Sequence, residues 1–445
     1  MRRPELPPGP FLVVGLARSG QAAALGLRER GEQVIGWDSA HPAGVESLAS
    51  ADVELHLGEG DGVPLVSRAA TLVKSPGVPR GVSVIEHAQM AGLTVVGELE
   101  LAWRMLPNEF VAVTGTNGKT TTVELIGHIY RVAGLPIAVA GNVGAALSGF
   151  VGRLDPRATV ACEASSFQLE DAVEFAPEVA VLLNVAPDHL DRHGTLDAYT
   201  QAKLRVFAKQ RAEDVAVLPL GLDLGPIPGA ARRVRFGDGP DADLAVLDGA
   251  LYWQGERLLD AREIGIPGRH NLQNAMAAAA ACLARGVDPG AVGEGLRTFP
   301  GVAHRMEAVA ELAGVRYVND SKATNVASAL VAIEASVGDR ANIHLILGGL
   351  DKGQDFTPLA AAVTGTCRAV YLIGQDANLI ARALAGVDVP VSECGTLERA
   401  VEQAARMARS GDVVLLSPAC ASLDQFVNYE ARGERFRELV SLIRD

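Results

Sequence analysis

Short apolar runs alternate with segments of helical spacing along most of the chain. Residues 11–14, 110–113 and 413–416 are runs of this kind, and each is followed by small or polar residues. Continuous apolar runs are typical of strands buried on both faces, as in a parallel sheet. In residues 120–131, apolar side chains instead recur on one face of a helix. The pattern therefore predicts an α/β fold with parallel sheets.

The same pattern divides the chain into three predicted domains. Residues 1–97 form a small Rossmann-like domain, and residues 98–300 form a central domain with a parallel sheet of the P-loop ATPase type. Residues 215–266 alternate short strands and turns, which predicts a small β extension of the central domain. A Phe-Pro-Gly break at residues 299–301 precedes residues 301–445, a second Rossmann-like domain.

A glycine turn between strand 110–113 and helix 120–131 carries the clearest chemical signal. Glycines let backbone N–H groups approach phosphate oxygens, and a helix N-terminus adds partial positive charge. A lysine in such a turn can reach the terminal phosphates of a nucleotide, and a following hydroxyl can bind Mg²⁺. The alternative is a tight turn with a surface lysine, because fewer residues than usual separate the two glycines. The turn consists of Gly115, Thr116, Asn117, Gly118, Lys119, Thr120 and Thr121.

Polar residues also follow the other predicted strands of the central domain. The carboxyl ends of parallel strands form the ligand crevice of such a sheet. Glu163 comes directly after strand 159–162 and is the natural Mg²⁺ partner beside the glycine turn, although an acid in this place is also typical of a helix cap. His189 and His193 have the spacing of a zinc pair, but without cysteines or an HExxH helix a magnesium or phosphate role is favoured.

Lys203 lies on the apolar stripe of a predicted helix, one turn from Tyr199 and close to Phe207. A charged amine on such a stripe is costly unless it is paired or chemically modified. The alternative is a lysine that extends its amine to water along an apolar surface. Further along, Asn271 is a plausible N-cap of an alanine-rich helix, and Asn274, one turn further, could instead face a nucleotide base.

The N-terminal domain has its own glycine turn, at residues 15–20, followed by a second strand that ends at Asp38. This arrangement is close to a dinucleotide-binding fingerprint, but Ala17 stands in the place of the middle glycine. A nicotinamide-dependent oxidoreductase is therefore one alternative function. In the C-terminal domain, polar loops again follow the strand ends, and the alternative there is a plain Rossmann-like partner domain.

Composition narrows the function further. The 445 residues are 48% hydrophobic and 21% charged, which is typical of a globular protein. A net charge of −13 argues against nucleic acid or an anionic membrane as a partner. The five cysteines lack a CxxC pair, so no disulfide framework or zinc site is indicated and a cytoplasmic location is expected. Residues 1–10 do not resemble a signal peptide, and the apolar helix around residues 275–284 is too short to span a bilayer.

Several short motifs follow one another in a characteristic order. Together they resemble the Mur ligase family over nearly the whole chain, and the C-terminal ones are similar to its D-glutamate-adding members. The stretch Asp-Asn-Pro-Arg, which marks the diaminopimelate-adding relatives, does not occur. After the glycine turn, the motifs are EASSFQL (163–169), NVAPDHLDRH (184–193), YTQAK (199–203), HNLQN (270–274), AHR (303–305), DSKATN (320–325), SPACASLDQF (417–426) and YEARG (429–433).

The resemblance implies an ATP-dependent ligase that joins D-glutamate to UDP-N-acetylmuramoyl-L-alanine in peptidoglycan precursor synthesis. It implies that ATP is held by the turn 115–121 with Asn274, Arg305 and Asp320. It also implies one Mg²⁺ on Thr120 and Glu163, and a second on His189 and Lys203, with Lys203 carbamylated by CO₂. Lys119, Glu163, His189 and Lys203 are the implied catalytic residues. The implied substrate contacts are Arg18, Ser19, Asp38 and Gly77 for UDP, Asn142, Ser165 and Gln168 for the muramoyl-alanine part, and Lys322, Thr324, Lys352, Ser422, Leu423 and Tyr429 for D-glutamate.

Alternatives within this chemistry are a folylpolyglutamate synthase or another amino-acid-adding Mur ligase. The alternatives of another class are the nicotinamide-dependent oxidoreductase and a non-catalytic nucleotide-binding module. The expected partners are small-molecule substrates, with neither nucleic acid nor membrane, and the expected oligomeric state is a monomer.

Overall fold

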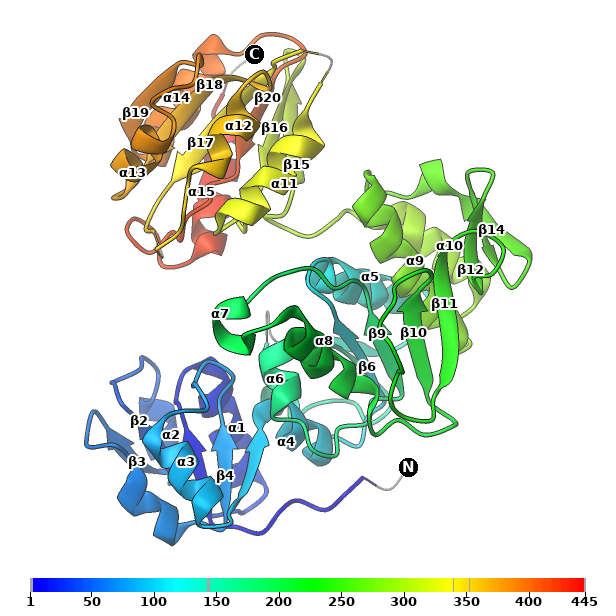
Figure 1. Ribbon diagram of the computed structural model, residues 1–445, viewed down its shortest axis with the longest axis vertical. Helices are drawn as coiled ribbons and strands as arrows, with labels where there is room; N and C mark the ends of the chain where they lie inside the picture. The colour runs from blue at the N-terminus through cyan, green and yellow to red at the C-terminus, as the bar shows by residue number, and fades with distance from the viewer. Residues whose placement is uncertain (1–2, 142–144, 339, 352, 444–445) are drawn as a thin grey trace. The chain divides into compact units, whose positions relative to one another are not determined.

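The computed structural model describes residues 3–141, 145–338, 340–351 and 353–443 (Figure 1). The chain divides into two compact units, Met1–Pro300 and Gly301–Asp445. The first unit contains two β-sheets and the second unit contains one. The three largely parallel sheets, each flanked by helices, confirm the predicted α/β architecture. The domain boundaries within the chain stay predictions.

The N-terminal sheet has five parallel strands in the order β3-β2-β1-β4-β5. The strand order reverses between β1 and β4, and ligands of such sheets bind at the carboxyl ends of the strands at this point. The strands are β1 Phe11–Val14, β2 Val34–Asp38, β3 Glu54–Leu57, β4 Thr71–Lys74 and β5 Thr94–Gly97, and the helices are α1 Arg18–Glu29, α2 Glu46–Ser50, η1 Val63–Arg68, α3 Ser83–Met90 and α4 Glu98–Met105.

The central sheet has nine strands in the order β14-β13-β12-β11-β10-β9-β6-β8-β7. It is parallel from β7 to β12, and β12, β13 and β14 form antiparallel hairpins, which is the predicted β extension. The strands are β6 Phe110–Thr114, β7 Ile137–Gly141, β8 Thr159–Glu163, β9 Val179–Leu182, β10 Val215–Pro219, β11 Arg232–Asp238, β12 Leu244–Leu247, β13 Ala250–Trp253 and β14 Glu256–Asp260.

The helices of this part are α5 Lys119–Val132, η2 Leu147–Phe150, α6 Ser166–Glu170, α7 Leu190–His193, α8 Leu196–Leu204, η3 Arg205–Phe207, η4 Ala261–Glu263, α9 Arg269–Ala284 and α10 Pro289–Thr298. The prediction that Asn271 caps α9 is wrong. The helix begins at Arg269 after Gly268, whose φ of +102° breaks the chain direction, and the Asn271 amide donates to the backbone oxygen of Pro267 at 2.8 Å.

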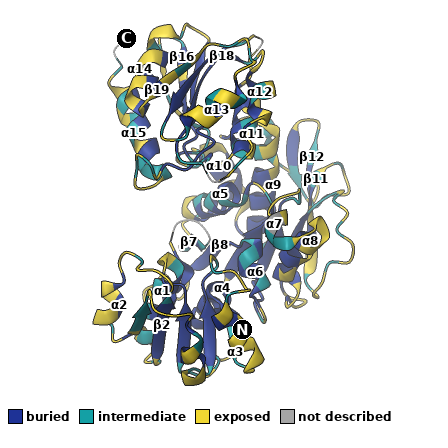
Figure 2. Cartoon of the chain, turned by 60° about the vertical axis from the view of Figure 1, so that its left-hand side comes forward, coloured by how far each residue is buried: buried dark blue, intermediate teal, exposed yellow. Residues whose placement is uncertain are grey.

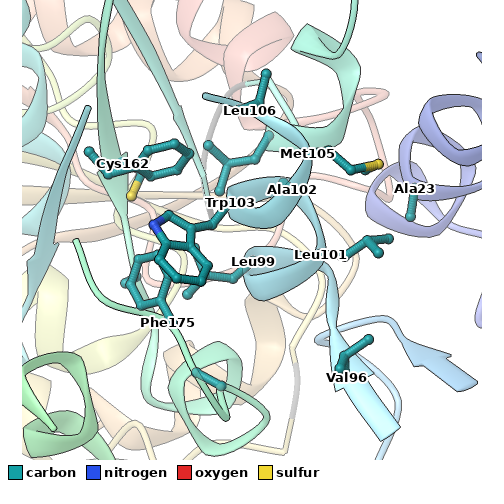
Figure 3. Packing of buried hydrophobic residues seen from close by; sticks show 14 of the residues in the cluster. Ala23, Val96, Leu99, Leu101, Ala102, Trp103, Met105, Leu106, Cys162 and Phe175 are labelled. Carbon is teal, nitrogen blue, oxygen red and sulfur yellow. The ribbon is translucent and has the colours of Figure 1, made fainter. Parts of the chain in front are cut away.

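One hydrophobic core joins the two sheets of the first unit, and α4 lies at its centre. Figure 3 shows Trp103 of α4 beside Phe175 and Cys162, while Met105 and Leu101 point toward helix α1. The rings of Trp103 and Phe175 meet edge to face with centroids 5.7 Å apart. This shared core explains why residues up to Pro300 form a single compact unit.

The sheet of the second unit has the order β15-β16-β20-β17-β18-β19, and only the edge strand β15 is antiparallel among them. Helices cover both faces, so the inner strands are buried (Figure 2). The strands are β15 Glu307–Leu312, β16 Val315–Asn319, β17 Ile343–Gly348, β18 Cys367–Ile373, β19 Val391–Gly395 and β20 Val413–Leu416, and the helices are α11 Val326–Ser336, α12 Pro358–Val363, α13 Ala377–Ala383, α14 Leu397–Met407 and α15 Tyr429–Ser441.

In the described residues, no helix combines the length and the apolar character that crossing a bilayer requires.

Candidate active site

The glycine turn lies where the sequence predicts it, between β6 and α5. Gly115 has a φ of +152°, and a Cβ there would lie 3.0 Å from the Cβ of Leu183. Gly118 has a φ of +87° and directly precedes α5, and a Cβ there would collide with Oδ1 of Asn274. Both positions therefore require glycine, because of their backbone angles and their close neighbours. The turn places the N-terminus of a fourteen-residue helix at the carboxyl edge of the sheet, as phosphate binding requires.

Two asparagines border this turn. Asn274, on α9, lies against Gly118 although the two residues are far apart in the sequence. Asn184, directly beyond β9, pairs with Asn117 of the turn. Its side-chain oxygen accepts from the Asn117 backbone N–H at 2.9 Å, and its amide donates to the Asn117 carbonyl at 3.1 Å. Sequence reasoning named Asn274 but not Asn184, whose position directly after a buried strand was the available signal.

Lys119 lies over the turn. Its ammonium donates to the carbonyls of Gly115 at 2.9 Å and Thr116 at 2.8 Å. A flexible lysine held near backbone carbonyls of a phosphate-binding turn can exchange them for the oxygens of a bound nucleotide. The arrangement thus places a positive charge at the site that the turn forms.

Thr120 and Glu163 come together because β6 and β8 are neighbours in the sheet. The Thr120 hydroxyl donates to Oε2 of Glu163 at 2.7 Å. A carboxylate and a hydroxyl are oxygen ligands of the kind that Mg²⁺ prefers, and both lie at the helix N-terminus beside the glycine turn. This donor set fits a magnesium ion. The alternative role of Glu163 as a helix cap does not apply, because Ser165 caps α6.

Lys203 is buried, with 1% of its surface exposed, so it does not extend its amine to water. The amine donates to the carbonyl of Gly115 at 2.8 Å and lies 4.2 Å from the ring centroid of Tyr199. Burial, together with the positive charge of Lys119, lowers the pKa of Lys203 to about 7. A large share of this amine is therefore neutral near neutral pH, which an ordinary lysine is not.

His189 and His193 lie in different surroundings. The His189 side chain is half-exposed, and its ring packs 4.8 Å from the ring of Phe167. The His193 side chain is buried, with its two ring nitrogens 3.1 Å from the Ser166 hydroxyl and 3.2 Å from the Glu170 carboxylate. Because both nitrogens of His193 already have partners on α6, the pair does not form a zinc site. The sequence did not predict that His193 connects α7 to α6 through these two contacts.

In the N-terminal sheet, the predicted UDP contacts gather at one edge. Arg18 and Ser19 begin α1, and Asp38 ends β2, where its carboxylate accepts from the Leu16 N–H at 2.7 Å. Gly77 is exposed on the turn after β4. Ala17, in the place of the middle glycine, has a φ of −71°, so its backbone conformation does not require glycine.

Ser165 and Gln168 form a reciprocal cap at the start of α6. The Gln168 N–H donates to the Ser165 hydroxyl at 3.2 Å, and the Ser165 N–H donates to the Gln168 side-chain oxygen at 3.0 Å. This capping box holds both side chains at the carboxyl edge of the central sheet, next to Glu163. Asn142, predicted to act with them, lies outside the described residues.

In the second unit, Asp320 follows β16 and is buried. Its carboxylate accepts two hydrogen bonds, one from the Ser417 hydroxyl at 2.8 Å and one from the Met306 N–H at 3.1 Å. Burial raises the pKa of Asp320 to about 6, while Arg305 and Lys322 act in the opposite direction. The family resemblance associates both Arg305 and Asp320 with ATP, and the hydrogen bond from the Met306 N–H places Asp320 against the residue that follows Arg305.

The residues predicted to bind D-glutamate gather only in part. The ammonium of Lys322 lies 5.9 Å from the ring centroid of Tyr429, at the start of α15, and Thr324 lies two residues further along the same loop. Ser422 is buried, whereas Leu423 is 64% exposed. Lys352 lies outside the described residues.

Arg432 is a residue that sequence reasoning missed in this unit, although it belongs to the YEARG motif. Its buried guanidinium donates to the Ser321 hydroxyl at 3.0 Å, to the Ser321 carbonyl at 2.9 Å and to the Cys420 carbonyl at 3.1 Å. It therefore connects the loop that carries Lys322 with the loop that carries Ser422.

Comparison with known proteins identifies the family. Three domain families match the chain: Mur ligase MurD-like N-terminal domain over residues 10–97, Mur ligase middle domain over residues 113–282, and Mur ligase glutamate ligase domain over residues 304–420. A UDP-N-acetylmuramoylalanine–D-glutamate ligase of Pelotomaculum thermopropionicum is 43% identical, with 96% of each chain covered. The chain belongs to the Mur ligase family.

Other relatives of this Mur ligase support the same family assignment. The protein of the same name in Acidobacterium capsulatum is 41% identical, with 98% of this chain and 97% of the relative covered. Among solved structures, the UDP-N-acetylmuramate-alanine ligase MurC of Thermotoga maritima is 19% identical and superposes with a TM-score of 0.61, covering 98% of this chain and 99% of that one. That structure supports the fold alone. The Mur ligase is therefore an enzyme of the ligase class, and Mur ligases use ATP and Mg²⁺.

The Mur ligase offers a direct test of the magnesium site. We expect Glu163→Gln, which removes the negative charge but keeps the shape of the side chain, to raise the Mg²⁺ concentration for half-maximal activity by about tenfold or more. The measurement is a magnesium titration of the ligase reaction. Glu124→Gln, at a partly exposed position on α5, serves as the control and leaves the titration unchanged. An unaltered magnesium requirement in Glu163→Gln would contradict the assignment.

Proposed function

We propose that this chain joins UDP-N-acetylmuramoyl-L-alanine to D-glutamate, with hydrolysis of ATP to ADP and phosphate, in the synthesis of peptidoglycan precursors. The observation that carries the proposal is the 43% identity, over nearly the full length, to a UDP-N-acetylmuramoylalanine–D-glutamate ligase. The glycine turn with Lys119, Thr120 and Glu163 supports it, because activation of a carboxylate by ATP requires such a phosphate and magnesium site.

The reaction proceeds in two transfers. First, the carboxylate of the muramoyl-alanine substrate attacks the γ-phosphorus of ATP, a P–O bond to ADP breaks, and an acyl phosphate forms. The neutral amine of D-glutamate then attacks the acyl carbon, the amide C–N bond forms, phosphate leaves, and the amine gives up a proton. Lys119 donates hydrogen bonds to the transferring phosphoryl group and balances its charge. Thr120 and Glu163 would hold a Mg²⁺ ion, which would supply further positive charge to the phosphoryl transfer.

A second magnesium site at His189 and Lys203 belongs to the proposal. The neutral amine of Lys203 attacks CO₂, an N–C bond forms and a proton is released, so that the side chain becomes a carbamate with one negative charge. The lowered pKa of Lys203 supports this step, because only the neutral amine reacts. A carbamate also suits a metal site, which an ammonium would repel. The half-exposed imidazole of His189 lies 6.3 Å from the ring of Tyr199, beside which Lys203 is buried.

The substrate contacts in this proposal are those that the resemblance to the family implies. We assign UDP to the edge formed by Arg18, Ser19, Asp38 and Gly77, and the muramoyl-alanine part to Ser165 and Gln168, with Asn142. ATP is assigned to the glycine turn, Asn274, Arg305 and Asp320. D-glutamate is assigned to Lys322, Thr324, Lys352, Ser422, Leu423 and Tyr429. A monomer in the cytoplasm is the expected setting.

Phosphate release tests the reaction and the acceptor together. We expect phosphate to appear from ATP and Mg²⁺ only when UDP-N-acetylmuramoyl-L-alanine and D-glutamate are both present. L-glutamate, L-lysine and diaminopimelate are the comparison acceptors. Release with one of these instead would move the chain to another amino-acid-adding member of the family. ATP binding without release in the presence of any acceptor would contradict the proposal.

A further inference from the structure

A buried ion pair connects the N-terminal sheet to helix α6 of the central sheet. Lys74 is the last residue of β4 and is fully buried, and Asp171 directly follows α6. The Lys74 ammonium lies 2.8 Å from Oδ2 of Asp171, and neither side chain is more than 4% exposed. The proposed function assigns neither residue a role.

The same ammonium also organises the turn after β4. It donates to the carbonyl of Val78 at 2.9 Å and to that of Ser75 at 3.3 Å, so it spans the turn that contains Gly77. The ammonium thus makes two hydrogen bonds to the turn and an ion pair with the carboxylate of Asp171. One charged group therefore contacts both the turn and the end of α6.

Asp171 makes further contacts with the N-terminal part of the chain. The Arg80 guanidinium lies 3.1 Å from its Oδ1 and also donates to the carbonyl of Glu170. The Gly97 N–H donates to the Asp171 carbonyl at 3.3 Å. A Cβ at Gly97 would lie 2.9 Å from that of Asp171, so the two backbones approach as closely as they can only because residue 97 is glycine.

Helix α6 is also connected, through side-chain contacts, to the surroundings of Lys203. Glu170 contacts Arg192 and His193 of α7, each at 3.2 Å. The His193 ring lies 5.1 Å from that of Tyr199, over which the amine of Lys203 lies. Helix α6 has only five residues, so Asp171 after its end and Ser165 at its N-cap lie less than two helical turns apart.

Burying a lysine and an aspartate is costly, and the cost is offset only while both partners are present. Burial lowers the pKa of Lys74, and the charge of Asp171 acts against this decrease. A connection of this kind adds little stability compared with an apolar contact, but it holds a defined geometry.

We infer that the Lys74–Asp171 ion pair fixes the distance between the two surfaces that bind the two ends of the nucleotide-sugar substrate. The inference rests on the proposed function, which assigns UDP to the edge that includes Gly77 and the muramoyl-alanine part to Ser165 and Gln168 on α6. Lys74 and Asp171 are positioning residues, because they hold the two binding surfaces and do not contact the reacting atoms. A substrate that bridges two surfaces gains affinity only when their separation matches its length.

Binding of a short and a long ligand tests the inference. We expect Asp171→Asn to leave the Kd for UDP unchanged and to raise the Kd for UDP-N-acetylmuramoyl-L-alanine by about tenfold, because UDP occupies only one of the two surfaces. Isothermal titration calorimetry measures both constants. Asp52→Asn, which changes an exposed carboxylate that pairs with Arg28 of helix α1, is the control and changes neither.

The double variant Lys74→Met/Asp171→Asn separates positioning from stability. It removes both buried charges, so its Tm recovers relative to Asp171→Asn, which leaves the lysine without its carboxylate. We expect the weakened binding of the long ligand to persist despite this recovery. Two results would overturn the inference. One is an equal rise in the Kd values for both ligands in Asp171→Asn, and the other is a wild-type Kd for the long ligand in the double variant.

Failure of the proposed function has a different signature. In that case the unaltered protein itself binds UDP-N-acetylmuramoyl-L-alanine no more tightly than UDP, and the inference fails with it. If the unaltered protein prefers the long ligand and Asp171→Asn keeps that preference, only the inference about the ion pair fails.

Discussion

Lys203→Met is expected to lower kcat for ligation about a thousandfold, the upper end of the loss seen when one preorganised charged group is removed from an active site. Methionine has nearly the length of lysine but cannot form a carbamate. The fold is expected to persist, because the side chain is buried beside the Tyr199 ring and an apolar group costs less there than an amine.

The carbamate itself provides a second readout. With a pKa of about 7, most Lys203 amines are neutral at pH 8, whereas an ordinary lysine is almost entirely charged at this pH. We therefore expect a carbamate resonance in ¹³C NMR spectra recorded in ¹³C-bicarbonate, and we expect its intensity to rise as the pH increases through 7. Lys203→Met lacks the resonance.

Lys209→Met provides the matched control, because Lys209 is partly exposed and pairs with Glu174 on the surface. This variant keeps both the rate and the resonance. A normal ligation rate in Lys203→Met would contradict the assigned role. If the unaltered protein shows no carbamate resonance, Lys203 is not carbamylated, and the amine itself is the functional group.

Lys119→Met is expected to lower kcat about a hundred- to a thousandfold, because the transferring phosphoryl group loses a fixed positive charge. The Kd for ATP is expected to change less than kcat, since the backbone N–H groups of the glycine turn and the helix N-terminus remain. Single-turnover measurement of ADP formation reports the affected step. Arg131→Met, which changes an exposed side chain in the last turn of the same helix, is the control.

The two lysines are also coupled. The charge of Lys119 is one cause of the lowered pKa of Lys203, so its removal raises that pKa. The pH at which the Lys203 carbamate is half-formed should therefore shift upward in Lys119→Met. An unshifted carbamate titration together with an unchanged kcat would show that Lys119 acts on neither the phosphoryl group nor its neighbour.

Much of the fold could be predicted because its signals are local. Continuous apolar runs such as Phe11–Val14 and Val413–Leu416 are buried strands in the structure. The glycines of the turn at residues 115–118 have backbone angles that other residues rarely adopt, so glycine itself marked the turn. The helix start was harder to place, because Asn271 has the chemistry of a cap while Gly268 provides the actual break.

The candidate site could be predicted where a residue type is typical of one chemical role, such as a lysine for phosphate or a glutamate for Mg²⁺. Lys119 and Thr120 begin the helix after β6, Glu163 ends β8, and the order of the parallel strands brings them to one edge. Partners that meet through tertiary packing were not predictable. Asn184 pairs with Asn117, and Arg432 connects two loops, yet neither is close in the sequence to the residues it holds.

The sequence by itself determined the α/β class, the phosphate-binding turn and the family, because these depend on local periodicity, on glycine and on short ordered motifs. Only the tertiary structure decided that Lys203 is buried against Gly115 and that Lys74 pairs with Asp171. Burial and charge pairing depend on which chain segments meet, and the same lysine is an ordinary surface cation or a neutral amine according to its neighbours.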